Sequence, residues 1–282
     1  MIFPENEKQK SPPLVSALVS VYNGEKFIRG LLEDLCSQSL GERLEVIVID
    51  SASPGGEAEL ISDCKRSLEK RKRQGENLPS LRYVRTPQRE TIYAAWNRGI
   101  QLARGRYITN ANVDDRHHPE ALEKLSSVAE AHPDVALVYA DSAVTESPNG
   151  VFGSAPLVGH FRWPGFDVRT LFGVCCVGPQ PLWRRDLHKK YGLFRADYRS
   201  GGDYEFWLRI SLKEKFLHVP EVLGLYLRNP GGVELSDPEL SQTECRQARQ
   251  DHWPKENGPI PKADKGYFVP LSEDCSVSER SL

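Results

Sequence analysis

Two short apolar runs near the start of the chain constrain its fold more than any other feature. Residues 14–21 and 44–49 are rich in β-branched side chains and are apolar on both faces, which is typical of strands buried inside a parallel sheet. Asn23-Gly24 ends the first run, and apolar residues then recur at helical spacing over residues 25–39. This strand–helix–strand order predicts a right-handed βαβ unit.

The same alternation of strand and helix patterns continues to about residue 140. Helical patterns around residues 60–68, 92–103 and 121–131 separate strand patterns at 81–84, 106–110 and 135–140. We therefore expect an α/β single domain with a mostly parallel central sheet and helices on both of its faces.

The pattern loosens in the second half of the chain. Residues 204–212 favour one more helix and residues 222–227 a last strand. Residues 230–282 contain 6 of the 20 prolines and few periodic segments. An irregular C-terminal tail is therefore expected, within which residues 267–271 are apolar enough to dock on the core.

Charge and hydropathy exclude several classes of partner. The chain has 37 Lys and Arg against 39 Asp and Glu, a net charge of −2, so it lacks the electrostatic signature of a nucleic-acid-binding protein. Its apolar passages fall short of the ~18 residues that span a bilayer, and residues 1–13 are polar, without a signal-peptide core. We expect a cytoplasmic protein that binds no nucleic acid and has no transmembrane anchor.

Polar and aromatic side chains follow the predicted strands, at the edge where ligands bind in parallel sheets. They are Tyr22, Asn23, Asp50, Ser51, Asn112, Asp114 and Asp115. Neither a GxGxxG fingerprint nor a GxxxxGK[ST] loop follows the first strand. The charge of a nucleotide would then fall to a divalent cation on carboxylates. The alternative is that Asp114 and Asp115 only cap the next helix or lie in a solvated turn.

Three segments with a fixed order and spacing point to a known family. They are residues 15–25 (VSALVSVYNGE), 44–53 (LEVIVIDSAS) and 97–108 (NRGIQLARGRYI), the last running into Asn112-Val-Asp-Asp115. Together they resemble the family 2 glycosyltransferases of GT-A fold, in the nucleotide-diphospho-sugar transferase superfamily. The resemblance covers roughly residues 13–228.

The resemblance implies a set of residues that bind a nucleotide-sugar donor. By position, Tyr22 would stack on the nucleobase. Asp50 and Ser51 match an acidic pair that contacts base and ribose, of which this chain keeps only the first acid. Arg89 and Asn97 would contact the diphosphate or the loop that holds it, although Asn97 has the alternative of a purely structural role. The full predicted set is Tyr22, Asn23, Asp50, Ser51, Arg89, Asn97, Asn112 and Asp114.

The resemblance also implies a metal site. Asn112-Val113-Asp114 occupies the place of the family's Asp-x-Asp motif, with Asn in place of the first acid. Asp114 and Asp115 are therefore the expected ligands of Mn²⁺ or Mg²⁺. His117-His118 nearby raises the alternative of zinc, which we disfavour because adjacent histidines rarely reach one metal.

A later segment implies the catalytic base. Residues 201–209 (GGDYEFWLR) resemble the family segment Glu-Asp-Tyr-Asp-Leu-Trp-Leu-Arg, which places Asp203 on the base position and Gly202 in place of the acid before it. Asn229 or a neighbour stands where the family has a histidine. The alternative for Asp203 is an N-cap on the following helix.

The implied activity is that of an inverting glycosyltransferase. It would move a sugar from a nucleotide-diphospho-sugar, with UDP expected, to a hydroxyl of a saccharide or lipid-linked glycan. Asp203 would remove the proton of the hydroxyl, and the cation would stabilise the leaving diphosphate. Surface polysaccharide or glycan synthesis at the inner face of the membrane, with peripheral association at most, is the implied setting.

Four segments follow from this interpretation. They are a polar extension (1–13), a nucleotide-sugar-binding half (14–115), an acceptor-binding and catalytic half (116–228) and a Pro-rich tail (229–282).

Two alternatives stay open. One is a nucleotide-sugar-binding protein of the same fold with lost or reduced catalysis, motivated by Asn112, Gly202 and the absent histidine. The other is a nucleotidyltransferase, which would need a Gly-rich basic loop after the first strand.

Overall fold

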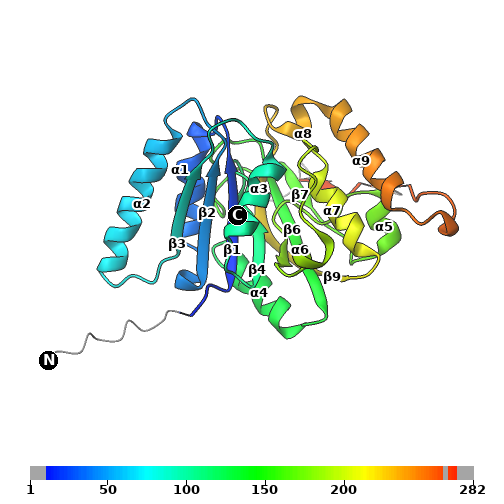
Figure 1. Ribbon diagram of the computed structural model, residues 1–282, viewed down its shortest axis with the longest axis horizontal. Helices are drawn as coiled ribbons and strands as arrows, with labels where there is room; N and C mark the ends of the chain where they lie inside the picture. Colours follow the sequence, from blue (N-terminus) through cyan, green and yellow to red (C-terminus); the bar gives the residue numbers. More distant parts are fainter. Residues whose placement is uncertain (1–10, 263–265, 272–282) are drawn as a thin grey trace.

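The computed structural model describes residues 11–262 and 266–271, and a ten-stranded sheet lies at its centre (Figure 1). Its strands are β1 Val15–Val21, β2 Leu44–Asp50, β3 Ser80–Arg85, β4 Tyr107–Asn110, β5 Arg116–His117, β6 Val135–Thr145, β7 Gly159–Phe161, β8 Leu182–Arg184, β9 Lys215–Leu227 and β10 Phe268–Pro270. The helices are α1 Glu25–Cys36, α2 Glu57–Arg73, α3 Ile92–Leu102, α4 Ala121–Ala131, α5 Val168–Gly173, α6 Leu187–Tyr191, α7 Gly202–Ser211, α8 Val233–Ser236 and α9 Pro238–His252, with short 3₁₀ turns at Gly41–Arg43 and Lys255–Asn257.

The sheet combines parallel and antiparallel pairs. β1 pairs in parallel with β2 and β4, β2 with β3, and β6 with β9. The short strands β5, β7, β8 and β10 pair antiparallel with their neighbours, and β8 lies between β4 and β6. The α/β class with a central sheet is thus confirmed, and the sheet is mixed in its second half, where strands of two or three residues leave too little hydrophobic pattern to be predicted.

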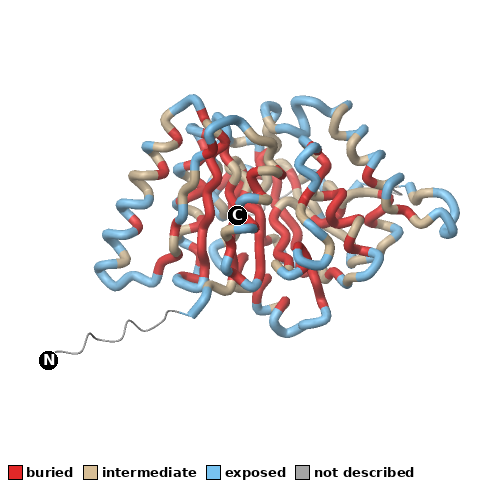
Figure 2. The backbone as a smooth tube through the Cα atoms, viewed as in Figure 1, coloured by how far each residue is buried: buried red, intermediate tan, exposed pale blue. Residues whose placement is uncertain are grey.

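Helices cover both faces of the sheet, as predicted. Val15, Ala17 and Val19 of β1 belong to a core cluster that includes apolar residues of α1, α2 and α4. Leu18 of the same strand belongs to a second cluster, with residues of α3, α5, α6, α7 and α9. Alternate side chains of a strand point to opposite faces, and Figure 2 shows the resulting buried strands between helices whose outer sides are exposed.

The C-terminal segment corrects one prediction. Residues 238–252, expected to be irregular, form α9, a helix of 15 residues that packs against α7. Asp237 caps this helix by accepting a hydrogen bond from Leu240 N–H, and Pro238 occupies its first turn, a strong helix-start signal. The predicted docking of residues 267–271 is confirmed, because β10 pairs with β7.

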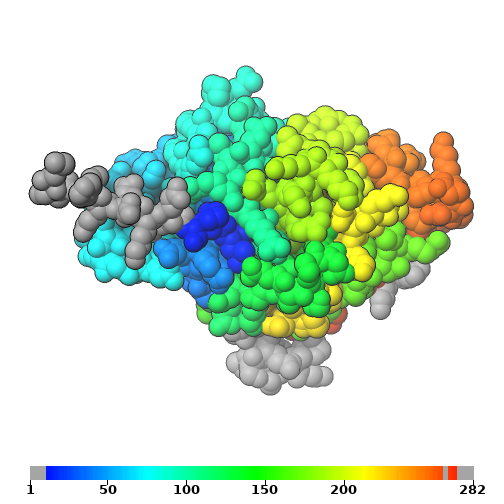
Figure 3. Space-filling model, turned by 60° about the horizontal axis from the view of Figure 1, so that its bottom comes forward, coloured from blue at the N-terminus to red at the C-terminus, as the bar shows by residue number. Residues whose placement is uncertain are grey.

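α2 and α9 lie at opposite ends of the molecule (Figures 1 and 3). Of the polar extension predicted for residues 1–13, residues 1–10 lie outside the described part of the chain. Among the described residues, no helix has both the length and the apolar character that crossing a bilayer requires.

Candidate active site

One edge of the sheet gathers the predicted site residues. β1, β2, β4, β6 and β9 run in the same direction, so the loops that follow them emerge at the same edge. Two residues there have left-handed backbone, Asn23 with φ of 53° and Ala52 with φ of 54°. Asn23 N–H also donates to Ser53 Oγ at 3.3 Å, so the loops after β1 and β2 are tied together. Strain of this kind concentrates at functional sites.

Asp50, at the end of β2, is fully buried and accepts three hydrogen bonds. Tyr83 Oη and Arg85 Nη1 each donate to its Oδ2 at 2.8 Å, and Ser53 N–H donates to Oδ1 at 2.8 Å. Burial and the neighbouring Asp50 raise the pKa of Tyr83. Asp50 therefore fixes the Arg85 guanidinium and the loop after β2. Ser51 beside it is buried, and its hydroxyl has no hydrogen-bond partner in the described part of the chain.

Tyr22 and Arg89 form an exposed pair at the same edge. The Arg89 guanidinium carbon lies 4.0 Å from the centroid of the Tyr22 ring, which is cation–π geometry. Tyr22 is 40% exposed and comes directly after β1. An aromatic face with an attached positive charge suits the base and phosphate of a nucleotide.

Asn97 binds the backbone of a loop from the second half of the chain. Its amide donates to Phe194 O at 2.8 Å and accepts from Phe194 N–H at 3.0 Å. These two bonds join α3 to the loop before α7. They favour the structural alternative for Asn97 over the predicted contact with substrate.

Asp115 is buried, and both of its carboxylate oxygens accept hydrogen bonds. Its Oδ1 accepts from Leu227 N–H at 3.0 Å and its Oδ2 from Asn112 Nδ2 at 3.1 Å. Burial, with a further contribution from Asp114, raises the pKa of Asp115 to about 8. Both of its oxygens are used in joining β4 to β9, so it is a weaker candidate metal ligand than Asp114.

Asp114 is half-buried, and its Oδ2 accepts a hydrogen bond from Asn229 Nδ2 at 2.8 Å. Among the described residues there is no group of three or more His, Cys, Asp and Glu side chains that could hold a metal ion. One carboxylate with the carbonyl oxygens of Asn112 and Asn229 still fits a cation that takes its other ligands from water and a bound diphosphate, as Mg²⁺ commonly does.

The two histidines near this site face away from each other. His117 Nδ1 lies 3.1 Å from Asp34 Oδ2 on α1, whereas the His118 ring packs edge-on against Phe152. They do not form a zinc site. Nor do Asp114 and Asp115 cap the next helix, because Glu120 is the N-cap of α4.

Asp203 occupies the second position of α7, whose N-cap is Gly201, so the N-cap alternative for Asp203 is wrong. Its Oδ1 accepts from Tyr93 Oη at 3.0 Å and from Tyr204 N–H at 2.8 Å. Burial raises the pKa of Asp203, although both hydrogen bonds oppose the rise, and the negative charge of Glu234 raises it further. A raised pKa suits a carboxylate that must accept a proton near neutral pH.

Tyr226 and Glu234 form a polar contact near the aspartates after β4. Tyr226 Oη lies 3.5 Å from Glu234 Oε2. Burial raises the pKa of Tyr226, and the negative charges of Glu234, Asp115 and Asp114 raise it further. The negative charge of Glu234 therefore acts on both Tyr226 and Asp203.

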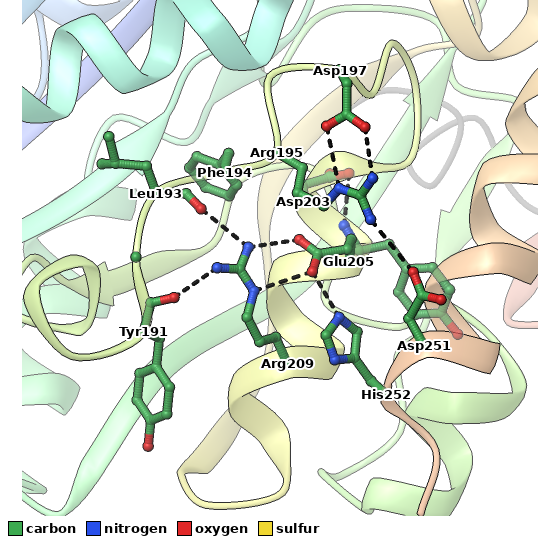
Figure 4. Close-up of polar contacts among 12 residues, drawn as sticks. Tyr191, Leu193, Phe194, Arg195, Asp197, Asp203, Glu205, Arg209, Asp251 and His252 are labelled. Carbon is green, nitrogen blue, oxygen red and sulfur yellow. Dashed lines mark hydrogen bonds and ion pairs between the residues drawn. The ribbon is translucent and has the colours of Figure 1, made fainter.

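Polar contacts hold α7 in place behind Asp203 (Figure 4). Glu205 is 2% exposed and accepts from Arg209 Nη2 at 2.6 Å, and its Oε1 lies 2.7 Å from His252 Nε2 on α9. Burial raises the pKa of Glu205, but the bonds from His252 and Arg209 more than offset this and lower it overall. Arg209 also donates to the carbonyl oxygens of Tyr191 and Leu193, so the loop before α7 is fixed as well.

Comparison with known families identifies the family to which the chain belongs. The model of the family "Glycosyl transferase family 2" matches residues 16–191, more than half of the chain. The chain belongs to glycosyl transferase family 2. The family match includes the loops after β1, β2 and β4 and ends before Asp203.

Relatives and solved structures agree with the family. A PGL/p-HBAD biosynthesis glycosyltransferase of Mycobacterium bovis is 24% identical, over 73% of this chain and 75% of that protein. Staphylococcus aureus TarS, solved with UDP-GlcNAc, superposes with a TM-score of 0.65 at 17% identity, over 83% of this chain and 65% of that one. The mannosyltransferase PcManGT of Pyrobaculum calidifontis, solved with GDP-Man and Mn²⁺, gives 0.58 at 19% identity, over 86% and 62%. At these identities the likeness establishes the GT-A fold alone.

Some curated relatives are much longer than this family 2 chain. The chain spans 26% of the length of one of them and 65% of another.

Several residues of the region were missed by the sequence analysis. Tyr83 and Arg85 contact Asp50, Tyr93 contacts Asp203, and Glu244 of α9 contacts the turn before α7. None of them lies in a motif, and each reaches the site from another element. The Asp237-Pro238 helix start was the one local signal that would have drawn attention to α9.

Proposed function

We propose that this chain transfers a sugar from a nucleoside-diphosphate sugar, with UDP as the nucleotide, to an acceptor hydroxyl with inversion at the anomeric carbon. The observation that carries the proposal is the arrangement around α7. A half-buried carboxylate with a raised pKa, Asp203, is affected by the negative charge of Glu234, which also acts on Tyr226 together with that of Asp114. Membership of the family supports the transfer of sugar residues.

The donor half of the proposal rests on the edge formed by the loops after β1 and β2. Tyr22 with Arg89 offers a flat, positively charged surface for the base. Arg85, held by Asp50, adds a second guanidinium at the loop after β2, and guanidinium groups bind phosphate oxygens well. Asn23 and Ser51 complete the proposed contact surface for the nucleotide.

We propose Asp114, with the carbonyl oxygen of Asn112, as the residues that hold Mn²⁺ or Mg²⁺. When bound, such an ion acts as a Lewis acid on the leaving diphosphate. Asp115 and its bonds to Leu227 and Asn112 keep this loop in place. A single charged ligand predicts weak binding of the ion in the absence of the nucleotide.

The transfer itself is one displacement. The Asp203 carboxylate takes the proton of the acceptor hydroxyl as its oxygen bonds to the anomeric carbon. The bond from that carbon to the diphosphate oxygen breaks, and the electron pair leaves with the nucleoside diphosphate. No protein nucleophile is required, so the configuration inverts. We propose a saccharide or lipid-linked glycan as the acceptor, in surface polysaccharide or glycan synthesis at the inner face of the membrane.

Replacement of Asp203 by Asn tests the proposal. Asn keeps the shape of the side chain but cannot accept the proton, so the rate of nucleotide release should fall by about a hundredfold or more. The rate is measured with Mn²⁺, UDP-, GDP- and dTDP-sugars and a panel of glycan acceptors. UDP affinity by calorimetry should change by less than about twofold, because Asp203 does not contact the nucleotide in this proposal.

Asp134→Asn is the matched control. Asp134 is exposed, pairs with Lys215 and precedes β6, at the opposite edge of the sheet. This variant should keep the wild-type rate. Undiminished transfer by D203N would rule out Asp203 as the base. UDP-sugar binding by the wild type with no turnover on any acceptor would instead favour the alternative, a binding protein that has lost catalysis, for which Gly202 and Asn112 are the motivating residues.

A further inference from the structure

α9 reaches across to the turn that carries Asp203. Glu244, on the second turn of this helix, accepts three backbone hydrogen bonds. Arg199 N–H donates to Oε1 at 2.9 Å, and Ser200 and Gly201 N–H each donate to Oε2 at 2.8 Å. One carboxylate thus binds three successive N–H groups immediately before α7.

The surrounding contacts give the turn a single position. Ser200 Oγ donates to Ser241 Oγ at 3.0 Å, one helical turn before Glu244. On the other side, Tyr93 Oη lies 2.5 Å from Ser200 O and 3.0 Å from Asp203 Oδ1. The same turn is therefore held by α9 from one direction and by α3 from the other.

The backbone at Gly201 packs closely against α9. A Cβ built on Gly201 would lie 3.3 Å from Glu244 Cβ and 3.4 Å from Cys245 Sγ, tighter than most side-chain contacts. The backbone at Gly201 can approach α9 this closely because glycine has no side chain. Asp203 follows two residues later, so a displacement of Gly201 is transmitted to the base.

We propose that Glu244 is a positioning residue for Asp203: by binding the N–H groups of residues 199–201, it sets the orientation of the base toward the acceptor hydroxyl. This inference rests on the proposed function. Its physical reason is that proton transfer depends on the placement of the base, and a shift of about 1 Å can cost a hundredfold in rate. The negative charge also lies at the N-terminus of α7, where the helix dipole favours it.

Glu244→Gln is the decisive variant. It keeps the size of the side chain but replaces one acceptor oxygen by an NH₂ group, which then faces a backbone N–H. The loss of charged hydrogen bonds to the turn should lower kcat by about ten- to hundredfold. KM for the donor and the affinity for UDP should stay within about twofold, because Glu244 has no contact with the nucleotide-binding edge.

A general loss of structure would look different. It would lower the number of UDP-binding sites per chain, so kcat is expressed per site titrated by calorimetry. Glu239→Gln provides the control, since Glu239 is an exposed acid on the same helix, two residues before Ser241. This variant should keep the wild-type kcat.

The outcomes of these measurements differ in what they support. A fall in kcat per site for E244Q at unchanged KM supports the inference, whereas a kcat equal to that of E239Q overturns it. If E244Q fails to fold, Ser241→Ala replaces it, with a two- to fivefold lower kcat expected from the loss of one neutral hydrogen bond and an unchanged kcat counting against the role. Inactivity of the wild type would refute the proposed function itself, while a dead D203N beside a fully active E244Q would refute only this inference.

Discussion

Gly202 and Tyr93 lie beside Asp203, at a position where the chain differs from the family segment that it resembles. A Cβ on Gly202 would come within 2.7 Å of the Tyr93 ring, which is buried. The acid that the family pattern has at this position therefore has no room here. Its space is taken by the ring whose hydroxyl donates to Asp203. Gly202 thus leaves room for a ring from α3 whose hydroxyl donates to Asp203.

His188 is a buried histidine whose two ring nitrogens both have hydrogen-bond partners. Trp183 Nε1–H donates to its Nε2 at 2.9 Å, so Nδ1 carries the proton that faces Gly192 O at 3.1 Å. Burial lowers the pKa of His188 to about 4. Below pH 6.5 the unfolded chain therefore binds a proton that the folded chain does not bind. The free energy of unfolding consequently falls as the pH drops from 6.5 toward 4.

The size of this effect is measurable by urea unfolding. Between pH 7 and pH 5, His188 should account for a loss of about 2 kcal/mol in the free energy of unfolding. His188→Gln keeps an acceptor for Trp183 and should show a correspondingly flatter pH dependence. His132→Gln, at an exposed position, should behave as the wild type. Equal slopes for all three proteins would mean that His188 is not neutral in the folded state.

At the scale of elements, α7 is held by its neighbours more than by its own sequence. Its first turn is bound by Glu244 of α9 and by Tyr93 of α3, and its middle by His252 of α9. Arg209 joins the helix to the loop of residues 191–193. α9 was not predicted, because its segment is polar and rich in proline nearby. It follows that the position of α7 could not be deduced from the local pattern of residues 204–212.

Arg209→Lys tests this network. Lysine cannot make the paired contacts with Glu205 and the two carbonyl groups, and it leaves the buried carboxylate poorly compensated. We expect a loss of about 3 kcal/mol in the free energy of unfolding. Arg98→Lys is the matched control: Arg98 also binds a carboxylate, Glu90, through two nitrogens, but it is half exposed, and its loss should stay below about 1 kcal/mol. Similar losses for both would show that burial of Glu205 carries no special cost.

For the whole molecule, one sheet joins the loop that carries Asp114 to the segment that carries Asn229. β4, which leads to Asp114, and β9, which leads to Asn229, are connected through β8 and β6. Asp115 adds a direct link by binding Leu227 N–H. Because residues from both halves of the chain meet here, binding of a nucleotide with its cation should stabilise the fold as a unit.

Thermal unfolding measures that coupling. UDP with Mn²⁺ at about a hundred times Kd should raise Tm by about 5 to 10 °C, and EDTA should remove most of the rise. Asp114→Asn should abolish the Mn²⁺-dependent part and keep the smaller effect of UDP alone. Asp134→Asn should respond as the wild type. A full Mn²⁺ effect in D114N would place the cation elsewhere.

The sequence by itself determined the features that depend on residues close together in the chain. The apolar strands, the amphipathic helices of the first half and the polar residues at strand ends follow from local periodicity, and the motif order indicates the family. Tertiary structure alone decided the pairing of strands two or three residues long, the packing of α9, and the partners of each site residue. Tyr93 and Glu244 reach Asp203 and its turn from distant segments. Such contacts form only when packing brings those segments together, so no local pattern encodes them.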